Sequence, residues 1–328
     1  MVSDNVPVIA PANGGSSGWI DFIKGLGLHD AIAKSAIGAI HRLIRGAVDY
    51  PAALLDSAAQ GVRDEQDAKS RITSALADAA IATIPKDPDL GARALAAWLP
   101  ETVRKQQNRE AVAQEAIKSL NDIDGAEHRP SEAELDPDWM NAFLRFAEDA
   151  SSERMRELWG RVLAREVVSR GSFSIRAIRF MAELDADTAS AFERISRHVF
   201  DHDGIDLPEK LEHELFADVF LLEQAGLVSY GAGRLAKFVT IGPDGRAGLE
   251  VQGNLLAIEG VPGHELTVRC GLLTKIGREI MGIVPSSDPL ETARSLAGRI
   301  PKGNLSMLGY VRKDDGKLEM IWNVSDDA

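Results

Sequence analysis

Residues 151–179 read SSERMRELWGRVLAREVVSRGSFSIRAIR, with seven arginines and three glutamates in a chain whose formal net charge is −13. Apolar residues recur there at steps of three and four, which predicts a helix with one buried stripe formed by Met155, Leu158, Trp159, Val162 and Leu163. Arg154, Arg161 and Arg165 fall together on the opposite side of that helix. The stretch therefore predicts a core helix that carries a basic outer face.

The basic face has two interpretations. Glu157 precedes Arg161 by four residues, and such a pair contributes about 0.2–0.5 kcal/mol on a solvated helix. Arginine also favours carboxylate partners, which the N-terminal third supplies at Asp64, Glu65, Asp67 and Asp78, within the chain or in a second subunit. The alternative is a surface for an anionic ligand, RNA or a partner, formed by Arg154, Arg161, Arg165 and Arg170.

Helix boundaries on either side of this stretch follow from capping residues. Asp136-Pro137 predicts an N-cap followed by proline in the first turn, and Ser151 is expected to cap the next helix. Arg170-Gly171 ends that helix, after which Ser172 or Ser174 caps another. Asp185 is expected to cap one more helix, which would run through Phe192, Ile195 and Val199.

The N-terminal third is predicted to be helical after a flexible leader over residues 1–18. We expect a broken amphipathic helix over 19–48 and further helices over 52–84 and 90–120. The 19–48 segment lacks the roughly 18 apolar residues of a membrane span. Core or oligomer packing is expected of it, and peripheral contact with a membrane surface is the alternative.

From Glu209 onward the pattern changes to a helix that stops at Gly226, several short glycine-punctuated strands and a helix in LTKIGREIMGIV. This order looks like a winged-helix-type unit. The tail predicts a helix over 290–299 and a hairpin of SMLGYV and KLEMIW, which turns at Asp314-Asp315-Gly316.

A winged helix often binds DNA, so the charge of this part matters. Residues 201–285 hold 13 Asp and Glu against 7 Lys and Arg, a net charge of −6, whereas DNA readers usually carry a basic stripe. The residues that would face phosphates on a wing are few: Arg234, Lys237 and Arg246. We expect this unit to serve structure or protein contact, with a DNA-binding regulator as the alternative.

His198 and His202 are spaced i, i+4, as two ligands of one divalent metal would be on a helix. The Glu of the H-E-x-x-H motif is missing, and a helix end with cationic residues gives the same pattern. A metal-dependent enzyme built on this pair is therefore the second alternative. Neither a phosphate-binding loop nor another cofactor motif is present, so we expect no cofactor and no enzymatic activity.

Composition bounds the setting of the protein. With 45% hydrophobic residues among 328, the chain can fill two or three cores. The single Cys270 cannot form an intramolecular disulfide, and the N-terminus lacks the features of a signal peptide. We therefore expect a reducing, cytoplasmic location.

Residues 139–192 resemble a bacterial domain-of-unknown-function family, number 2806. The shared phrases are a serine-capped "E-x-M-x-x-L-W" helix and "G-S-F-S", which rest here on Met155, Leu158, Trp159, Gly171 and Phe173. Where a proline often precedes the glycine, this chain has Arg170. The Leu-Trp phrase is also similar to one in alpha-type abortive-infection proteins of phage defence, and this similarity implies a defence role by analogy.

Together these observations predict a mainly α protein with a smaller α+β part: an N-terminal and central helical bundle, then a winged-helix-like unit, a C-terminal helix and a hairpin. The expected segments are 1–18, 19–127, 128–204, 205–285 and 286–328. The expected function is non-enzymatic, a protein–protein interaction or scaffold role through a protein partner or self-association, within phage defence.

Overall fold

The computed structural model describes residues 30–45, 88–122, 135–208, 211–284 and 288–327. Two compact units divide the chain, Met1–Gly171 and Ser172–Ala328. The expected leader, the helix over 52–84 and the Asp and Glu residues proposed there as arginine partners lie outside the described residues. Within the described ranges, no helix is both long and apolar enough to cross a bilayer.

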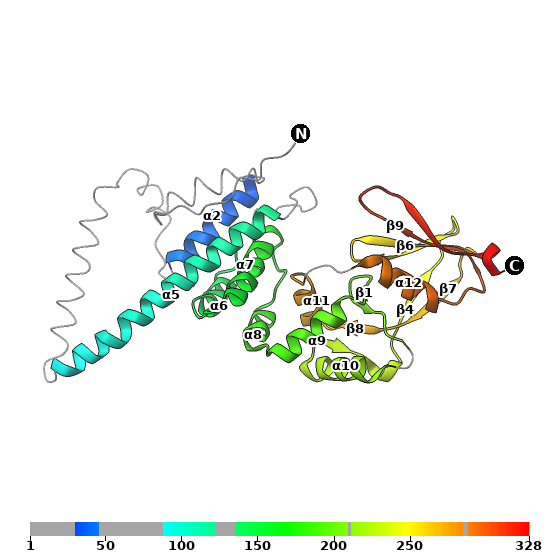
Figure 1. The fold of residues 1–328 in the computed structure, drawn as a ribbon. Helices are drawn as coiled ribbons and strands as arrows, with labels where there is room; N and C mark the ends of the chain where they lie inside the picture. Colours follow the sequence, from blue (N-terminus) through cyan, green and yellow to red (C-terminus); the bar gives the residue numbers. More distant parts are fainter. Residues whose placement is uncertain (1–29, 46–87, 123–134, 209–210, 285–287, 328) are drawn as a thin grey trace. The chain divides into compact units, whose positions relative to one another are not determined.

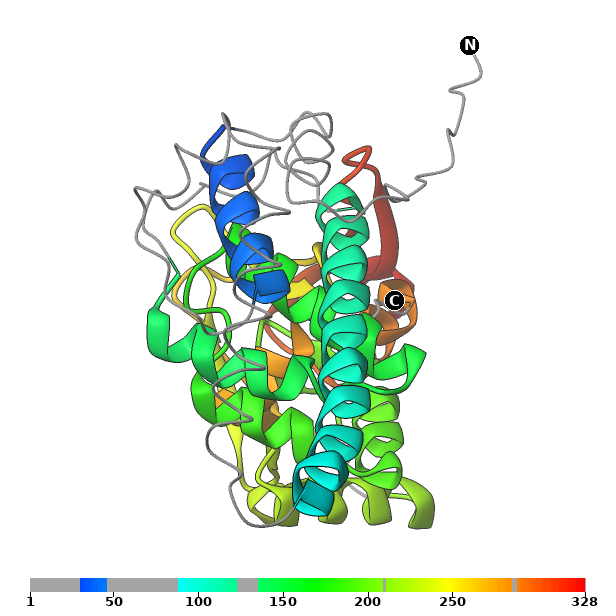
Figure 2. The same ribbon diagram turned by 90° about the vertical axis from the view of Figure 1, so that its left-hand side faces the viewer.

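The first unit contains α2 (Asp30–Arg45), α5 (Pro88–Asp122), α6 (Pro137–Ala147) and α7 (Glu153–Val168). The helix predicted over 90–120 is confirmed as α5, which includes Pro100 in its interior. Figures 1 and 2 show the first turns of α5 extending past α2. The apolar face of α2 is buried at Ile32, Ala36, Ala39, Ile40 and Leu43.

Close packing of α5 against α7 depends on Gly160. A Cβ added there would lie 2.5 Å from the Glu115 Cβ and 2.7–2.8 Å from backbone atoms of Glu115 and Ala116. Beside this contact, Trp159 is 1% exposed and stacks on Phe146 at 5.8 Å between ring centroids, with Phe143 edge-on at 5.7 Å. The predicted apolar stripe of α7 therefore faces an aromatic core.

Helix starts in this unit follow the expected chemistry with one correction. Asp136 caps α6, with Pro137 in the first turn, as predicted. The cap of α7 is Ser152, whose hydroxyl accepts from the Met155 N–H at 3.3 Å, and not Ser151. A serine bonds the N–H three residues on, and two adjacent serines leave that choice open in the sequence.

The second unit begins with α8 (Ile175–Glu183) and α9 (Ala186–Ser196), capped by Ser174 and Asp185 as predicted. Val199 does not continue α9, because it begins a hairpin of β1 (Val199–Phe200) and β2 (Gly204–Ile205). Asp201 and His202 take positive φ angles of 44° and 67° in the tight turn between these strands. The expected continuation through Val199 was therefore wrong.

Next come α10 (His213–Ala225), which ends at Gly226 as predicted, β3 (Val228–Ser229) and a 3₁₀ turn (Gly231–Gly233). Three more short strands of this unit are β4 (Ala236–Thr240), β7 (Glu265–Arg269) and β8 (Gly271–Leu273). The first sheet has the order β1-β2-β8-β3, and β4 pairs separately with β7. The helix α11 (Lys275–Met281) follows and is capped by Thr274.

Ser174 ties the beginning of this unit to α11. Its N–H and its hydroxyl both donate to the Glu279 carboxylate, at 2.9 and 2.7 Å. The helices α8 and α11 are thereby joined across 105 residues of sequence.

A second sheet has the order β10-β9-β6-β5. Its strands are β5 (Arg246–Val251), β6 (Asn254–Gly260), β9 (Leu305–Val311) and β10 (Leu318–Asn323), and the predicted tail hairpin is β9 with β10. The predicted tail helix, α12 (Pro289–Arg299), lies beside the sheet in Figure 1 and shares its core through Ala293, Leu296 and Ala297. The last element among the described residues is a 3₁₀ turn, Val324–Asp327.

At the coarse level, the expected order is therefore confirmed: helices first, then a mixed part with small antiparallel sheets. The division into five segments is not tested by these observations and stays a prediction.

Candidate functional site

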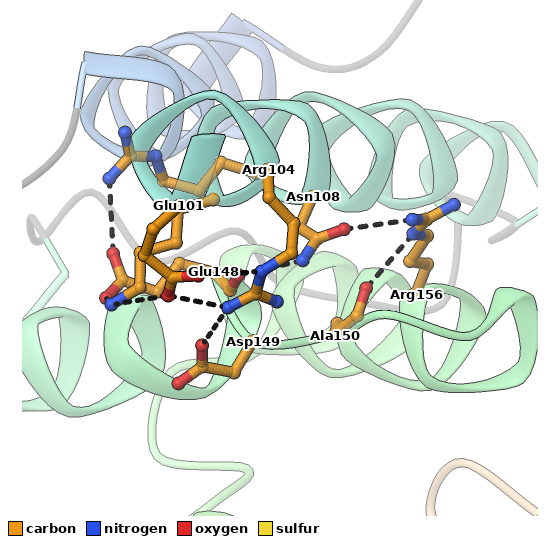
Figure 3. Close-up of polar contacts among 9 residues, drawn as sticks. Glu101, Arg104, Asn108, Glu148, Asp149, Ala150 and Arg156 are labelled. Atoms are coloured by element: carbon orange, nitrogen blue, oxygen red, sulfur yellow. Dashed lines mark hydrogen bonds and ion pairs between the residues drawn. The ribbon is translucent and has the colours of Figure 1, made fainter. Parts of the chain in front are cut away.

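A polar junction joins α5 to the turn between α6 and α7 (Figure 3). Asn108 is 1% exposed, and its amide donates to the Glu148 carbonyl at 2.9 Å. Its side-chain oxygen accepts from Arg156 Nη2 at 2.9 Å, and Arg156 Nε donates to the Ala150 carbonyl at 3.0 Å. Because every partner is backbone or buried amide, this part of the arginine-rich helix serves the fold.

Cations of α5 surround Glu148 in the same junction. Lys105 Nζ lies 2.8 Å and Arg109 Nη1 lies 3.2 Å from its two carboxylate oxygens. The hydrogen bond to Glu148 raises the pKa of Lys105 above its ordinary value. Farther out, Arg104 contacts Glu101 at 2.7 Å and Asp149 at 3.2 Å, in an exposed setting where such pairs contribute little.

The four arginines predicted as a ligand or partner surface do not share one environment. Arg154 and Arg165 are exposed and Arg161 is half-buried, all on α7. Arg170 lies beyond the helix and donates to the Ser35 hydroxyl of α2. Arg170 therefore belongs to the packing between two helices, and the other three remain on the α7 surface.

The residues that carried the family resemblance mostly support the fold. Trp159 and Phe173 are each 1% exposed, whereas Met155 and Leu158 are half-buried. Gly171 has a φ of +76°, which favours glycine, and its N–H donates to the buried Glu166 carboxylate at 2.7 Å. Glu166 and the "G-S-F-S" phrase thus form one turn that the Glu166 carboxylate holds.

The histidine pair does not lie on a helix. His198 follows α9 and is half-buried, and His202 occupies the exposed β1–β2 turn, so the i, i+4 geometry of a helix does not apply. Burial lowers the pKa of His198 below its ordinary value. Across the described ranges, no group of three or more His, Cys, Asp or Glu side chains is arranged to hold a metal ion.

The three cations predicted for a DNA-binding wing are separated in their roles. Lys237 on β4 is held inside the unit by Asp201 at 2.6 Å and Asp203 at 2.7 Å, and Arg278 also contacts Asp203 at 3.0 Å. Arg246 on β5 contacts Glu259 at 3.1 Å. Arg234 is exposed beside the 3₁₀ turn.

An exposed aromatic pair lies on α10. Phe216 and Phe220 are 51% and 52% exposed, and their rings stack with 6.1 Å between centroids and 12° between planes. Other positions of the helix, Val219 and Leu222, are buried. The helix therefore presents apolar side chains both to the core and to solvent.

The helix α10 itself carries carboxylates and no lysine or arginine. Glu212 at the N-cap position, Glu214 and Glu223 are exposed. Asp218 receives both Nε and Nη2 of Arg194 from α9 at 2.6 Å, and Glu223 accepts from the Tyr230 N–H at 2.8 Å. Glu212 lies four residues before Phe216 and Glu223 lies three residues after Phe220, so both share the helix face of the two rings, whereas Glu214 does not. We call Phe216, Phe220, Glu212 and Glu223 the α10 patch.

The sequence analysis did not identify the α10 patch. A signal was present, because HELFADVFLLEQA places apolar residues around more than one face of the helix. A surface helix that packs on one side only needs a single stripe, so a second stripe indicates either burial on both sides or a contact surface.

The comparisons with known proteins bear on the same segment. A family model described as a protein of unknown function (DUF2806) matches residues 92–235. Comparison with curated proteins found no match, and comparison with solved structures found none either. The match runs from the first turns of α5 to the residue before β4 and includes α10. The resemblance to domain-of-unknown-function family 2806 is therefore confirmed, over a longer segment than the 139–192 stretch that first indicated it.

Proposed function

We propose that the protein works by protein–protein contact, and that the α10 patch binds a partner segment that presents apolar side chains flanked by lysine or arginine. The observation that carries the proposal is the stacked, half-exposed pair Phe216 and Phe220. Aromatic side chains are enriched at the centres of protein interfaces, where a few of them supply most of the binding energy.

The charges around the pair define the partner. Asp218 is paired with Arg194, whereas Glu212 and Glu223 are exposed on the helix face that carries the two rings. Negative potential there attracts cationic partners and repels acidic ones. A cationic amphipathic helix matches both features, because its apolar face covers the rings while its lysines or arginines meet the carboxylates.

The same charges disfavour a DNA role for this unit. The strand order β2-β8-β3, with α10 directly before β3, supports the winged-helix-like interpretation. In DNA-binding helix-turn-helix proteins, a helix of the motif enters the major groove and lies between phosphates. A helix with acidic residues and no lysine or arginine is poorly suited to that position. We therefore favour a winged-helix-like unit that contacts protein.

Two matched peptides test the proposal. One is a labelled helical peptide of leucine and lysine, and the other replaces every lysine with glutamate. We expect the full-length protein to bind the cationic peptide in fluorescence anisotropy and to ignore the acidic one. Phe216→Ser with Phe220→Ser should weaken binding at least about 30-fold, the size of a hot-spot loss.

Gln224→Ser, on the same exposed side of α10, serves as the control and should leave binding unchanged. Equal binding by the double variant, or no binding of the cationic peptide, would refute the proposed contact. Retention of mixed duplex DNA in a low-salt gel shift, lost on Arg234→Ala, would instead favour the DNA-binding alternative.

A scaffold role of this kind fits the similarity to abortive-infection proteins, from which we propose a role in phage defence. The buried Cys270 is compatible with the reducing cytoplasm proposed for it. Deleting the gene and challenging the host with diverse phages should raise plating efficiency for some of them. Unchanged plating across a broad panel would contradict the defence role without affecting the α10 contact.

A further inference from the structure

The two edges of the β10-β9-β6-β5 sheet differ in what covers them. At the β5 edge, the Glu250 carbonyl accepts from the Asp201 N–H at 2.6 Å, and the Arg246 carbonyl accepts from the Gly242 N–H at 2.8 Å. Among the described residues, no hydrogen bond from another strand reaches the β10 edge. The sheet therefore has one engaged edge and one open edge.

The register shows which backbone groups β10 presents. Leu318 lies opposite Val311 of β9, and the Arg312 N–H donates to the Lys317 carbonyl at 3.2 Å. A bond between these flanking positions makes Leu318 and Val311 a non-hydrogen-bonded pair. The N–H and C=O of Leu318 consequently point away from β9, toward the open edge, and those of Met320 follow two residues later.

Side chains on the outer face of this edge are apolar and exposed. Leu318 and Met320 are 50% and 49% exposed, and Leu255 of β6, which lies beyond Val311 in the same cross-strand row as Leu318, is 41% exposed. Leu318 lies over Gly309, where an added Cβ would be 2.5 Å from Leu318 Cδ1. Antiparallel sheets with one covered face commonly present polar residues on the other, so this apolar outer face requires an explanation.

Charges on either side of Leu318 are opposite and equally spaced. Lys317 precedes it, with an 83% exposed side chain, and Glu319 follows, half-buried beside Arg294 of α12 at 2.5 Å. In an antiparallel pairing centred on Leu318, position 317 of one strand faces position 319 of the other. A copy of the same strand thus brings opposite charges together on both sides of the centre.

We propose that β10 pairs antiparallel with β10 of a second copy of this chain, with Leu318 opposite the partner's Leu318. The two leucines exchange their outward N–H and C=O groups, and Lys317 meets the partner's Glu319. The result is a continuous eight-stranded sheet with two-fold symmetry, in which residue i contacts residue j and j contacts i. Its outer face joins the two apolar surfaces.

The alternative occupant is an extended peptide added to the same edge. The self-complementary order Lys317-Leu318-Glu319 favours the second copy, because an unrelated peptide has no reason to carry it. The pairing is short, since a bulge follows Met320 and a turn precedes Lys317. The dimer is therefore expected to dissociate on dilution.

Sedimentation velocity of the full chain over a wide concentration range tests the association. We expect a monomer–dimer equilibrium, which Lys317→Glu weakens about tenfold by placing a like charge opposite the partner's Glu319. The double change Lys317→Glu with Glu319→Lys restores the opposite pair and should recover most of that loss. Leu318→Pro removes the outward N–H without removing a bond to β9 and should also abolish the dimer.

A cross-link locates the contact directly. Leu318→Cys should form an intermolecular disulfide under mild oxidation, because paired strands bring the two Cα atoms within bonding range. Val261→Cys, 55% exposed elsewhere in the unit, is the control and should react much more slowly. Hydrogen exchange of β9 in each variant verifies that the hairpin is folded.

Three outcomes would overturn the proposal. They are a monomer at every concentration with equal cross-linking of the two cysteine variants, a dimer indifferent to Lys317→Glu and Leu318→Pro, and association only with added extended peptides. The last outcome would assign the edge to a peptide partner.

Discussion

The helices α7 and α10 distribute charge and apolar surface in opposite ways. On α7, Trp159 is buried, and Arg156 donates hydrogen bonds to the Asn108 side chain and to the Ala150 carbonyl. On α10, two phenylalanines are half exposed and two glutamates stand beside them. At least one of the arginines that stand out in the α7 sequence therefore makes hydrogen bonds within the fold. On α10, by contrast, the fold leaves the apolar side chains of Phe216 and Phe220 exposed.

This difference teaches where to look for a partner. A charged side chain on a surface is ordinary, since water solvates it at little cost. Two stacked rings left in water forgo the free energy of burial, and this unused free energy is the basis of the contact proposed above. Substitutions on α7 should therefore change stability, and substitutions on α10 should change binding.

The largest effect on stability is expected at the α5–α7 contact. Gly160→Ala brings a Cβ within 2.8 Å of α5 backbone atoms, which must separate the helices and should lower the free energy of unfolding by about 1–3 kcal/mol or more. Gly38→Ala is the control, because no atom lies within 4 Å of an added Cβ in α2. That variant should gain about 0.5–1 kcal/mol. Urea unfolding of the full chain measures both variants. An unchanged free energy of unfolding in Gly160→Ala would contradict the close packing of α5 against α7 at this residue.

A similar or smaller loss is expected at the polar junction. Asn108→Ala removes an acceptor from Arg156 and a donor from the Glu148 carbonyl in a buried site, which should cost about 1–3 kcal/mol. Gln107, the exposed residue just before Asn108, provides the control: Gln107→Ala should change the free energy of unfolding by no more than about 0.5 kcal/mol. Hydrogen exchange should show faster opening of residues 153–168 in the first variant alone.

A pH-dependent effect is expected in the second unit at His198. Burial lowers its pKa, so the unfolded chain takes up a proton at higher pH than the folded chain does. The free energy of unfolding should therefore rise with pH up to the ordinary value of 6.5 and change little above it. His198→Gln should remove this rise in urea titrations between pH 5 and 8. The charges of Asp206 and Glu291 partly oppose this lowering of the His198 pKa. If the free energy of unfolding of the variant rises with pH by the same amount, a group other than His198 causes the rise.

The smallest stability change is expected on α10. Phe220→Ser removes a side chain that is 52% exposed, so it should shift the free energy of unfolding by no more than about 0.5 kcal/mol. It should still weaken binding of the cationic peptide. Val219→Ser, on the buried face of the same helix, is the contrast and should destabilise the protein strongly. If both variants unfold alike, α10 is packed on two sides and the proposed contact surface does not exist.

Local rules predicted most element boundaries. Asp136-Pro137, Asp185 and Gly226 act through neighbours a few residues away, so the sequence suffices to assign them. The error at Val199 has a tertiary cause, because an apolar residue continues a helical stripe as readily as it begins a strand and only the pairing with Ile205 decides.

Surface features were less accessible to sequence reasoning. The register of β10 fixes which of its backbone groups are free, and that register depends on β9 and on the bulge after Met320. The exposure of Phe216 likewise depends on what covers α10, which no local pattern states. The predicted arginine surface shows the converse, since Arg170 looked available until α2 was placed beside it.

The joining of Ser174 to Glu279 has a consequence for how the chain is made. The central strand of the first sheet, β8, also comes late, and it must insert between β2 and β3. A ribosome synthesises residues 172–230 well before β8 and α11 exist, so the nascent second unit waits with α8 incompletely covered and with β2 and β3 lacking the strand between them. Domains that complete late expose apolar surface for longer during synthesis, so we expect the folding of this half of the protein to depend on translation speed and on chaperones.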